Sequence, residues 1–249
     1  MNMEAGKTVI IVGAFGGIGT SITCLLLKKG FWVIALTHRN RTEPDLITLQ
    51  EEWAGLSVID NIDYNDTQGL KQKLSSISKT YVYDHIVICN GYLKVQSYLM
   101  GDDDSLRDSY EKNFVFPMSL VRSLIRPFLR RGRSCGASVL FMSSVSVRLG
   151  TQGRIAYVAG KAALESAVKV LAQELGRYGV RVNCLAPGLI STNMLYENTS
   201  TSDLCGILQR IPMGRVGQPS EIASVVEFML SDSASYINAA TIPIDGGMV

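Results

Sequence analysis

The stretch from Thr8 to Gly19 reads TVIIVGAFGGIG and decides the fold class. Its first five residues, Thr8–Val12, form a short apolar run of the kind that becomes a strand buried on both faces of a parallel sheet. The glycines that follow open a segment with helical apolar spacing, which ends near Lys29. This order favours phosphate binding, because the turn lets a ligand approach the backbone and the helix offers free N–H groups. We therefore expect a dinucleotide site here rather than a purely structural turn.

Outward from this stretch, strand-like and helix-like segments alternate to the end of the chain. Further runs of strand length occur at Phe31–Leu36, Leu56–Asp60, His85–Cys89, Ser138–Met142, Val180–Cys184 and Thr241–Ile244, the last an expected edge strand. Helical patterns occur at Leu46–Trp53, Thr67–Ser78, Leu106–Arg130, Ala156–Tyr178 and Pro219–Leu230, with interruptions expected near Pro117 and Pro127. The alternation predicts an α/β fold, a Rossmann-type doubly wound parallel sheet of about seven strands with helices on both faces. We expect a single dinucleotide-binding domain over residues 1–249, with a substrate loop around residues 188–212.

Composition excludes several other classes of protein. Of the 249 residues, 47% are hydrophobic and 18% are charged, which supports a large buried core rather than disorder. The 24 basic residues nearly balance the 22 acidic ones, so no nucleic-acid footprint is expected. Five scattered cysteines without a CxxC pair argue against a disulfide framework or a metal site and favour a reducing cytoplasm. The first apolar run is too short for a signal or membrane segment, and we expect a cytoplasmic protein without a membrane partner.

Two features of the cofactor region set expectations about the ligand. The glycine spacing is compatible with GxxxGxG, through Gly17, and with GxxGxxG, through Gly16. The second strand ends in Thr37-His38-Arg39-Asn40-Arg41, with no acidic residue before Glu43. A carboxylate at this position would bond the adenosine ribose and repel a 2′-phosphate, whereas arginine binds phosphate well. We therefore expect NADP(H) to be favoured over NAD(H), the alternative being a solvated basic loop.

Three side chains that carry chemistry follow the fifth strand. Ser144 comes directly after it, Tyr157 lies thirteen residues further on, and Lys161 lies four residues after Tyr157. Positions i and i+4 share one face of a helix, so a lysine charge next to the phenol would favour the phenolate and produce a tuned general acid/base. A YxxxK pair alone is common on helix surfaces. Its position near the carboxyl ends of the strands is what favours a catalytic role.

Together, these motifs resemble the short-chain dehydrogenase/reductase family in its compact, single-domain branch, nearly from end to end. The segments at residues 212–219 and 245–248 are most similar to 3-oxoacyl-[acyl-carrier-protein] reductases. The resemblance implies a catalytic set of Asn113, Ser144, Tyr157 and Lys161. It implies, with the loop and strand-end residues, a cofactor-binding set of Gly13, Phe15, Gly16, Gly17, Ile18, Gly19, Thr37, His38, Arg39, Asp63, Tyr64, Asn90, Gly91, Tyr157, Lys161, Pro187, Gly188, Ile190 and Thr192. The chain departs from the family pattern at Val12 and at Cys89-Asn90, where the family commonly has Thr and Asn-Ala.

The activity that the resemblance implies is NADPH-dependent reduction of a ketone to a secondary alcohol. Tyr157 would protonate the alkoxide, Ser144 would orient the carbonyl, Lys161 would tune Tyr157 and hold the nicotinamide ribose, and Asn113 would fix a water. The expected substrate is a 3-oxoacyl thioester on acyl-carrier protein, as in fatty acid biosynthesis. The alternatives are a free small ketone, a sugar or a polyketide intermediate, and a non-catalytic NADP(H) sensor. The intact catalytic set argues against the sensor, and the short chain argues against a nucleotide-sugar epimerase.

Two expectations concern partners. The arginines from Arg122 to Arg133 form a basic stretch that would attract an acidic acyl-carrier protein, or else serve as a solvated face or subunit contact. The helices at Leu106–Arg130 and Ala156–Tyr178 carry more apolar positions than one sheet face would bury, which predicts a homotetramer. The apolar positions concerned are Phe114, Val115, Phe116, Leu120, Val168 and Leu171, with Ile242, Ile244 and Val249 at a second contact.

Overall fold

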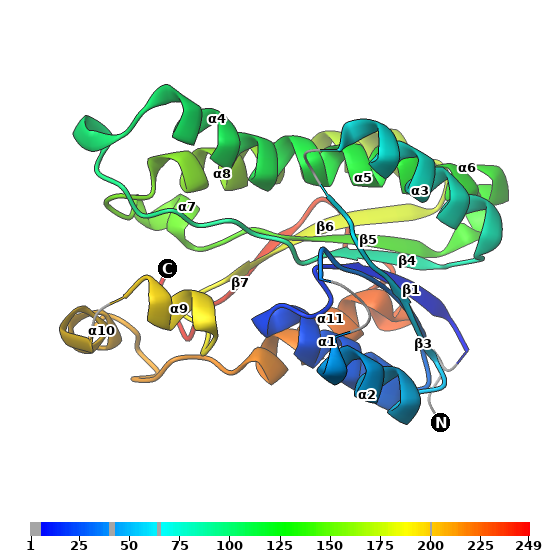
Figure 1. Cartoon of the computed structure of the whole chain (residues 1–249), viewed down its shortest axis with the longest axis horizontal. Coiled ribbons are helices and arrows are strands. Elements are labelled where there is room, and N and C mark those ends of the chain that lie inside the picture. Colours follow the sequence, from blue (N-terminus) through cyan, green and yellow to red (C-terminus); the bar gives the residue numbers. More distant parts are fainter. Residues whose placement is uncertain (1–5, 40–42, 64–65, 200) are drawn as a thin grey trace.

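Seven parallel strands form one sheet through the middle of the molecule (Figure 1). The computed structural model describes residues 6–39, 43–63, 66–199 and 201–249. The strands are β1 (Thr8–Val12), β2 (Trp32–Leu36), β3 (Leu56–Ile59), β4 (His85–Ile88), β5 (Ala137–Met142), β6 (Val180–Pro187) and β7 (Thr241–Ile244). Their order is β3-β2-β1-β4-β5-β6-β7, so the order reverses between β1 and β4. This confirms the doubly wound fold and places the switch point, where ligands bind in such sheets, at the ends of β1 and β4.

Helices cover both faces of the sheet (Figure 1). One layer contains α3 (Thr67–Thr80), α4 (Asp103–Tyr110), α5 (Phe116–Leu124), α6 (Arg126–Arg131) and α8 (Ile155–Gly176), and the other contains α1 (Gly17–Lys28), α2 (Pro44–Glu52) and α11 (Pro219–Leu230). Shorter helical segments are η1 (Tyr98–Met100), η3 (Gly132–Cys135), α7 (Ser146–Leu149), α9 (Asn193–Glu197), α10 (Thr201–Leu208) and η4 (Asp232–Ala234). The sheet therefore lies between two helical layers, as predicted.

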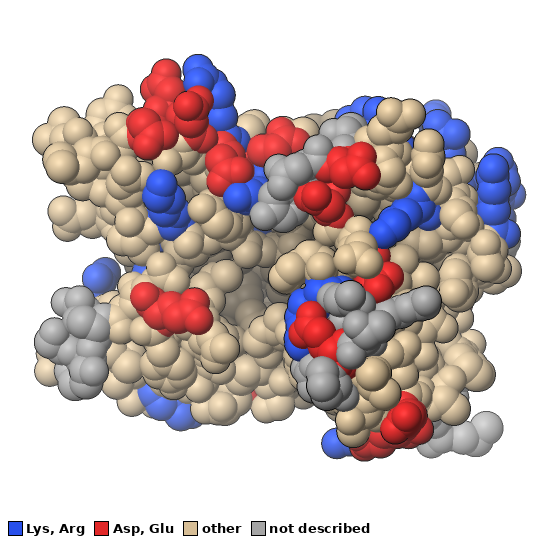
Figure 2. Space-filling model, viewed as in Figure 1, with Lys and Arg blue, Asp and Glu red and all other residues tan. Residues whose placement is uncertain are grey.

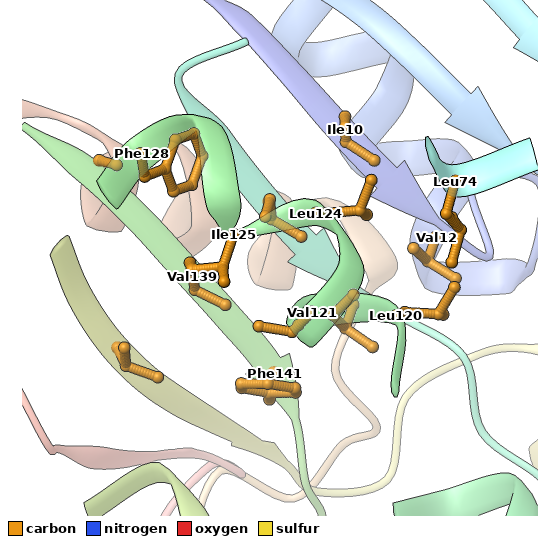
Figure 3. Packing of buried hydrophobic residues seen from close by; sticks show 14 of the residues in the cluster. Ile10, Val12, Leu74, Leu120, Val121, Leu124, Ile125, Phe128, Val139 and Phe141 are labelled. Atoms are coloured by element: carbon orange, nitrogen blue, oxygen red, sulfur yellow. The ribbon is translucent and has the colours of Figure 1, made fainter. Parts of the chain in front are cut away.

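The strands bury both of their faces because their side chains alternate between two cores. On β1, Ile10 and Val12 belong to the core under α3 and α5, and Val9 and Ile11 belong to the core under α1 and α11. Figure 3 shows α5 turning its apolar side chains toward β1 and β5. All of these strand residues are at most 3% exposed, which explains why the strands read as continuous apolar runs.

The long helix expected over residues 106–130 is divided by its two prolines. The π-helical segment η2 (Glu111–Val115) lies between α4 and α5, and Pro117 and Pro127 each occupy the first turn of a new helix. Proline has no N–H, so Pro117 cannot donate to the carbonyl of Asn113, its partner in a regular α-helix. The widened turn brings the predicted site residue Asn113 into a special backbone position.

Some of the apolar helix residues on which the homotetramer prediction was based are buried within the single chain. Phe116 is 6% exposed, and Leu120 and Val168 are fully buried in the core, so these three residues do not form a contact surface. The expectation for them was wrong, because α5 and α8 pack on the sheet through these positions. Phe114 and Leu171 pack only partly against the same core. The homotetramer itself stays a prediction.

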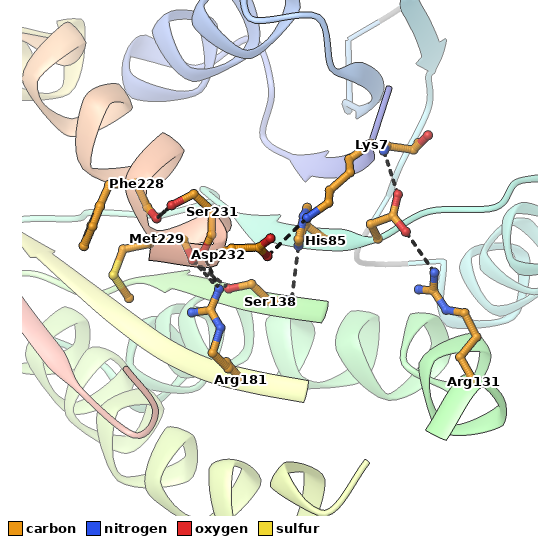
Figure 4. Close-up of polar contacts among 11 residues, drawn as sticks. Lys7, His85, Arg131, Ser138, Arg181, Phe228, Met229, Ser231 and Asp232 are labelled. Carbon is orange, nitrogen blue, oxygen red and sulfur yellow. Dashed lines mark hydrogen bonds and ion pairs between the residues drawn. The ribbon is translucent and has the colours of Figure 1, made fainter. Parts of the chain in front are cut away.

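The amino ends of the strands carry a bonded polar network (Figure 4). The backbone N–H of Ser138 donates to Nδ1 of His85, and Arg181 donates to the carbonyl of Met229 at 2.7 Å. Arg131 donates to Asp84 at 2.9 Å and to the carbonyl of Tyr83 at 2.6 Å. This edge is opposite the one where ligands are expected.

The part of the arginine stretch on α6 lies at this amino edge as well. Arg131 is bonded there, and α6 stands at the end of the molecule opposite α9 and α10 (Figure 1). The basic surface on α6 is therefore not beside the carboxyl ends of the strands, which a docking role near the cleft would require.

Candidate active site

The loops after β1, β4, β5 and β6 meet at the carboxyl edge of the sheet and form a cleft of about 920 Å³. Figure 2 shows the surface hollowed in this region, between the two lobes of the molecule. The cleft brings together many of the predicted residues: Ile18, Asn90, Gly91, Ser144, Tyr157, Lys161, Pro187, Gly188, Ile190 and Thr192. Parallel strands present their carboxyl ends at one edge, so residues far apart in the sequence share this site.

The glycine loop has the geometry of a phosphate cradle. Gly13 has φ +74°, and a Cβ there would lie 3.1 Å from the backbone N of Asn90. A Cβ on Gly17 would lie 2.6 Å from Cγ2 of Thr192, and one on Gly19 would lie 2.0 Å from the carbonyl oxygen of Gly13. At Gly16 the nearest atom would be at 3.5 Å, an ordinary contact. Packing thus excludes side chains at Gly13, Gly17 and Gly19, which favours the GxxxGxG reading.

The helix that follows the loop leaves its first turn available to an anion. No side chain caps the N-terminus of α1, and no acidic residue stands in its first turn. Uncapped N–H groups and the positive end of the helix dipole attract phosphate. With the tight approach of Gly13 and Gly17, this arrangement fits the diphosphate of a dinucleotide.

The residues expected around the adenosine end of the cofactor differ in their burial and in their bonding partners. Thr37 is buried, and its Oγ1 accepts the backbone N–H of Arg39 at 3.0 Å. The guanidinium of Arg39 donates to the carboxylate of Glu43, with an Nε–Oε2 distance of 2.7 Å. His38 and Asp63 are exposed, Phe15 packs partly against the core, and Tyr64 lies outside the described residues. The cation expected to hold a 2′-phosphate is therefore already shared with a carboxylate.

The departure from the family pattern at Asn90 has a structural consequence. Its Nδ2 donates to the carbonyl of Lys112 at 3.0 Å, and its Oδ1 is buried with no hydrogen-bond partner among the residues described. A buried acceptor without a partner is costly, so a donor from a ligand or a water is expected there. This orphaned acceptor, beside Gly13 and Gly91 in the cleft region, fits a polar ligand.

Tyr157 and Ser144 form a pair of hydroxyls in the cleft. Both side chains line the cleft, and the Ser144 hydroxyl is a hydrogen-bonding neighbour that influences the pKa of the phenol. Burial raises the pKa of the Tyr157 phenol, while the Ser144 hydroxyl and the positive charge of Arg154 act in the opposite direction. Arg154 is thus a cation near Tyr157 that the sequence does not predict, and the tuning of Tyr157 by Lys161 stays a prediction. A phenol held protonated at neutral pH is suited to donate a proton.

Lys161 is buried next to this pair. Its Nζ donates to the carbonyl of Met142 at 2.7 Å and to that of Asn90 at 3.3 Å, and lies 5.8 Å from the centre of the Tyr157 ring. Burial lowers the pKa of Lys161 to about 8. An ammonium with such a pKa exchanges protons close to neutral pH, which suits a group that replenishes a proton.

The side chain of Asn113 holds the loop after β4 in place through hydrogen bonds. Its amide exchanges two hydrogen bonds with the backbone of Tyr92, at 3.0 and 2.8 Å, and donates to the carbonyl of Ser109. The amide is thus fully occupied with positioning the loop after β4. The group that Pro117 leaves without its regular helical donor is the backbone carbonyl of Asn113, which is the better acceptor for the predicted water.

Three residues at the site are absent from the predicted set. A Cβ on Gly160 would lie 2.9 Å from Cβ of Asn113, so this glycine lets α8 approach η2. Glu165 accepts the hydroxyl of Ser143, the neighbour of Ser144, at 2.5 Å. Arg154 lines the cleft. Gly160 could have been found from the sequence, because a glycine inside a helical pattern indicates close packing. No local pattern in the sequence indicates that Glu165 or Arg154 belongs to the site.

The fold and the hydroxyl–lysine site together define a dehydrogenase/reductase of the short-chain class, and the chain belongs to the short-chain dehydrogenase/reductase family. The family model described as enoyl-(acyl carrier protein) reductase matches residues 13–249. The chain is 32% identical over 245 residues to the 3-oxoacyl-[acyl-carrier-protein] reductase FabG of Salmonella typhimurium, covering 98% of this chain and 97% of the relative. It is 31% identical to the uncharacterized oxidoreductase YmfI of Bacillus subtilis, covering 97% of this chain and 98% of that one.

Solved structures agree with this assignment. A 4-hydroxyisoleucine dehydrogenase complexed with NADH superposes with a TM-score of 0.87 at 28% identity, covering 98% of this chain and 99% of the other. The chain is therefore an NAD(P)-dependent oxidoreductase. No helix in the described part of the chain is both long and apolar enough to cross a membrane.

Proposed function

We propose that the protein reduces a ketone to a secondary alcohol with NADPH, and that its substrate is a 3-oxoacyl thioester on acyl-carrier protein. The observation that carries the reaction type is the presence of the Tyr157 and Ser144 hydroxyls together in one cleft. Two hydroxyls that converge in a cleft can both donate to one carbonyl oxygen, where negative charge develops during reduction of C=O. The description of the family model names an enoyl reductase, which reduces a C=C bond. The paired hydroxyls instead favour a ketone as the group that is reduced.

In the mechanism, the residues act on the oxygen of the substrate. Bound NADPH supplies hydride to the carbonyl carbon. Tyr157 donates its proton to the oxygen, and its pKa, raised by burial, keeps that proton available. Ser144 donates a hydrogen bond to the same oxygen and orients it, an interaction worth about 3 kcal/mol in the transition state. Lys161, with its pKa of about 8, returns a proton to Tyr157 and holds the nicotinamide ribose. The carbonyl of Asn113 holds the water that connects Lys161 to solvent.

The preference for NADPH is part of the proposal. Its support is the end of β2, where no acidic side chain occupies Thr37 and where Arg39 stands two residues further on. Binding of the 2′-phosphate requires Arg39 to exchange the carboxylate of Glu43 for the phosphate, which reduces the preference without reversing it. Arg41, the second cation of the prediction, lies outside the described residues.

The support for the thioester comes from the relatives named FabG and from the C-terminal motifs that resemble them. The position of α6 gives no support to carrier docking on the arginine stretch. A free small ketone stays the alternative substrate. The cytoplasmic location, the homotetramer and a role in fatty acid biosynthesis stay predictions.

A turnover experiment tests the proposal. NADPH oxidation is followed with an acetoacetyl thioester, free and carrier-bound, and with simple ketones; NADH replaces NADPH in a parallel series. We expect turnover of the thioesters and a higher kcat/KM with NADPH. Absence of turnover with every ketone, combined with intact NADPH binding, would favour the non-catalytic sensor. An equal or higher kcat/KM with NADH would contradict the cofactor assignment.

A further inference from the structure

The substrate half of the cleft carries positive charge that the predicted mechanism does not use. Beyond the cofactor loops, its walls include apolar side chains such as Leu93, Leu149 and Ile207. Arg154 and Arg210, which have no role in that mechanism, also line it, and none of the described lining residues is Asp or Glu. A pocket whose described lining includes apolar side chains and cations but no acidic group is suited to a small anionic ligand.

Arg154 is the cation closest in sequence to the reacting group. It directly precedes α8, three residues before Tyr157, which lies within the first turn. Its charge reaches the phenol of Tyr157. One helical turn rises about 5 Å, so the backbone of Arg154 lies about one turn from that of Tyr157, and both side chains line the same cleft.

The backbone that carries Arg154 is fixed to the opposite wall of the cleft. Gly153 has φ +75°, and a Cβ there would lie 3.1 Å from Cγ1 of Val95. The carbonyl of Gly153 accepts the backbone N–H of Gln96 at 2.8 Å. This link joins the loop before α8 to the loop after β4, so the position of Arg154 is set by tertiary contact and not by the helix alone.

Among the residues that the structure describes, the guanidinium of Arg154 has no partner, whereas comparable cations do. Arg154 is half-buried, yet none of the described side chains forms an ion pair or hydrogen bond with it. By contrast, the half-buried Arg131 is paired with Asp84 and Lys112 is paired with Asp108. A partly desolvated guanidinium without a counter-charge gains most from a carboxylate, because its planar fork donates two parallel hydrogen bonds.

We propose that Arg154 is a specificity-determining residue that binds the carboxylate of a short free oxo acid, whose ketone is reduced at Tyr157. This inference rests on the proposed ketone reduction and extends its substrates from thioesters to anionic oxo acids. The reaction is unchanged: hydride comes from the cofactor, the proton comes from Tyr157, and the carboxylate is only bound. A neutral thioester offers Arg154 one carbonyl oxygen, whereas a carboxylate offers two oxygens and a charge.

The first experiment compares two substrates that differ in a single methyl group, which converts the carboxylate into a neutral ester. The kcat/KM values of acetoacetate and methyl acetoacetate are measured with NADPH for the wild type, Arg154→Gln, Arg154→Lys and Arg148→Gln. Arg148 is exposed on α7 and does not line the cleft, so its variant controls for loss of a nearby surface charge. Any effect of the Arg154 charge on Tyr157 falls on both substrates alike. The ratio of the two kcat/KM values therefore isolates binding of the carboxylate.

We expect Arg154→Gln to lower the acid-to-ester ratio about 10- to 100-fold, the range for a lost charge-assisted hydrogen bond. Arg154→Lys should restore part of the ratio, and Arg148→Gln should leave it unchanged. An equal loss with acid and ester would mean that Arg154 acts only through Tyr157 or through the loop. An unchanged ratio would mean that the carboxylate does not bind Arg154. Either result would overturn the proposal.

A second measurement keeps the test independent of turnover. Malonate, a dicarboxylate without a ketone, is added to the NADPH complex, and the thermal unfolding midpoint is recorded. We expect malonate to raise the midpoint of the wild type and Arg148→Gln but not of Arg154→Gln. The same shift in all three proteins would place the anion elsewhere and reject the Arg154 site. If no ketone is turned over while the malonate shift depends on Arg154, the ketone reductase proposal fails and the anion site stands.

Discussion

The two edges of the same sheet hold arginine side chains with different partners. At the amino edge, Arg131 is bonded to Asp84 and to the carbonyl of Tyr83, and Arg181 is bonded to the carbonyl of Met229. At the carboxyl edge, Arg154 has no partner among the described side chains, and Oδ1 of Asn90 is buried without one.

The difference shows that residue type alone does not identify a binding site. A cation bonded to a carboxylate or to main-chain carbonyls contributes to stability, and a cation in a cleft without such bonds is available for a ligand. The comparison therefore predicts that changes at the carboxyl edge alter activity, whereas changes at the amino edge alter stability.

The largest effect is expected at Tyr157. Replacement Tyr157→Phe removes the proton donor and retains the buried ring, so we expect kcat to fall by about 10³-fold. Binding of NADPH, followed by its fluorescence, should remain close to that of the wild type. Substantial residual turnover would show that another group donates the proton.

The amino edge should respond to pH through His85. Burial, with the charges of Lys7, Arg181 and Arg131, lowers the pKa of His85 to about 3, and only Asp84 acts in the opposite direction. The unfolded chain, with a histidine pKa near 6.5, binds the proton more readily, so stability is full above about pH 6.5 and falls as the pH drops toward 3. The slope contributed by this residue is at most about 1.4 kcal/mol per pH unit.

Denaturant unfolding between pH 7 and pH 4.5 measures this slope. The variant His85→Gln keeps an acceptor for the N–H of Ser138 and lacks the titrating ring, so we expect its slope to be smaller by the His85 contribution. Identical slopes in the two proteins would mean that His85 does not control the acid sensitivity.

A smaller effect on stability is expected at Arg131. Replacement Arg131→Gln breaks its bonds to Asp84 and Tyr83. Because both charged side chains are about one third exposed, we expect a loss of only about 1–2 kcal/mol in the free energy of unfolding, measured in urea. Arg130→Gln, on the exposed side of the same helix, is the matched control and should cost less than about 0.5 kcal/mol. If Arg131→Gln lowered kcat/KM without changing stability, the division between the two edges would be wrong.

The smallest effect is expected at Arg39, a carboxyl-edge cation that does have a protein partner. Replacement Glu43→Gln removes the competing charge, so we expect a rise of about two- to five-fold in the kcat/KM ratio of NADPH to NADH, as for loss of one partly exposed ion pair. Arg39→Gln should lower the same ratio. Opposite changes would mean that Arg39 does not contact the 2′-phosphate.

Much of the fold was predictable because it depends on local patterns. The strand at Thr8–Val12, the glycine turn and α1 are adjacent in sequence, and α11 and β7 have the predicted bounds. Strand β6 is longer than predicted, because its last residues pair with β7 through Pro187 and Ile244. The break of the helix at η2 was placed near Pro117, but the π-turn there was not expected.

The sequence by itself determined the order of the elements and the set of Ser144, Tyr157 and Lys161, because helical spacing and the carboxyl ends of parallel strands bring such residues to one place. Only the tertiary structure decided which partners each side chain has. It turned α6 and its arginines to the amino edge, paired Arg39 with Glu43, and left Arg154 facing the cleft. The physical reason is that hydrogen bonds and ion pairs depend on distances between segments far apart in the chain, which no local pattern encodes.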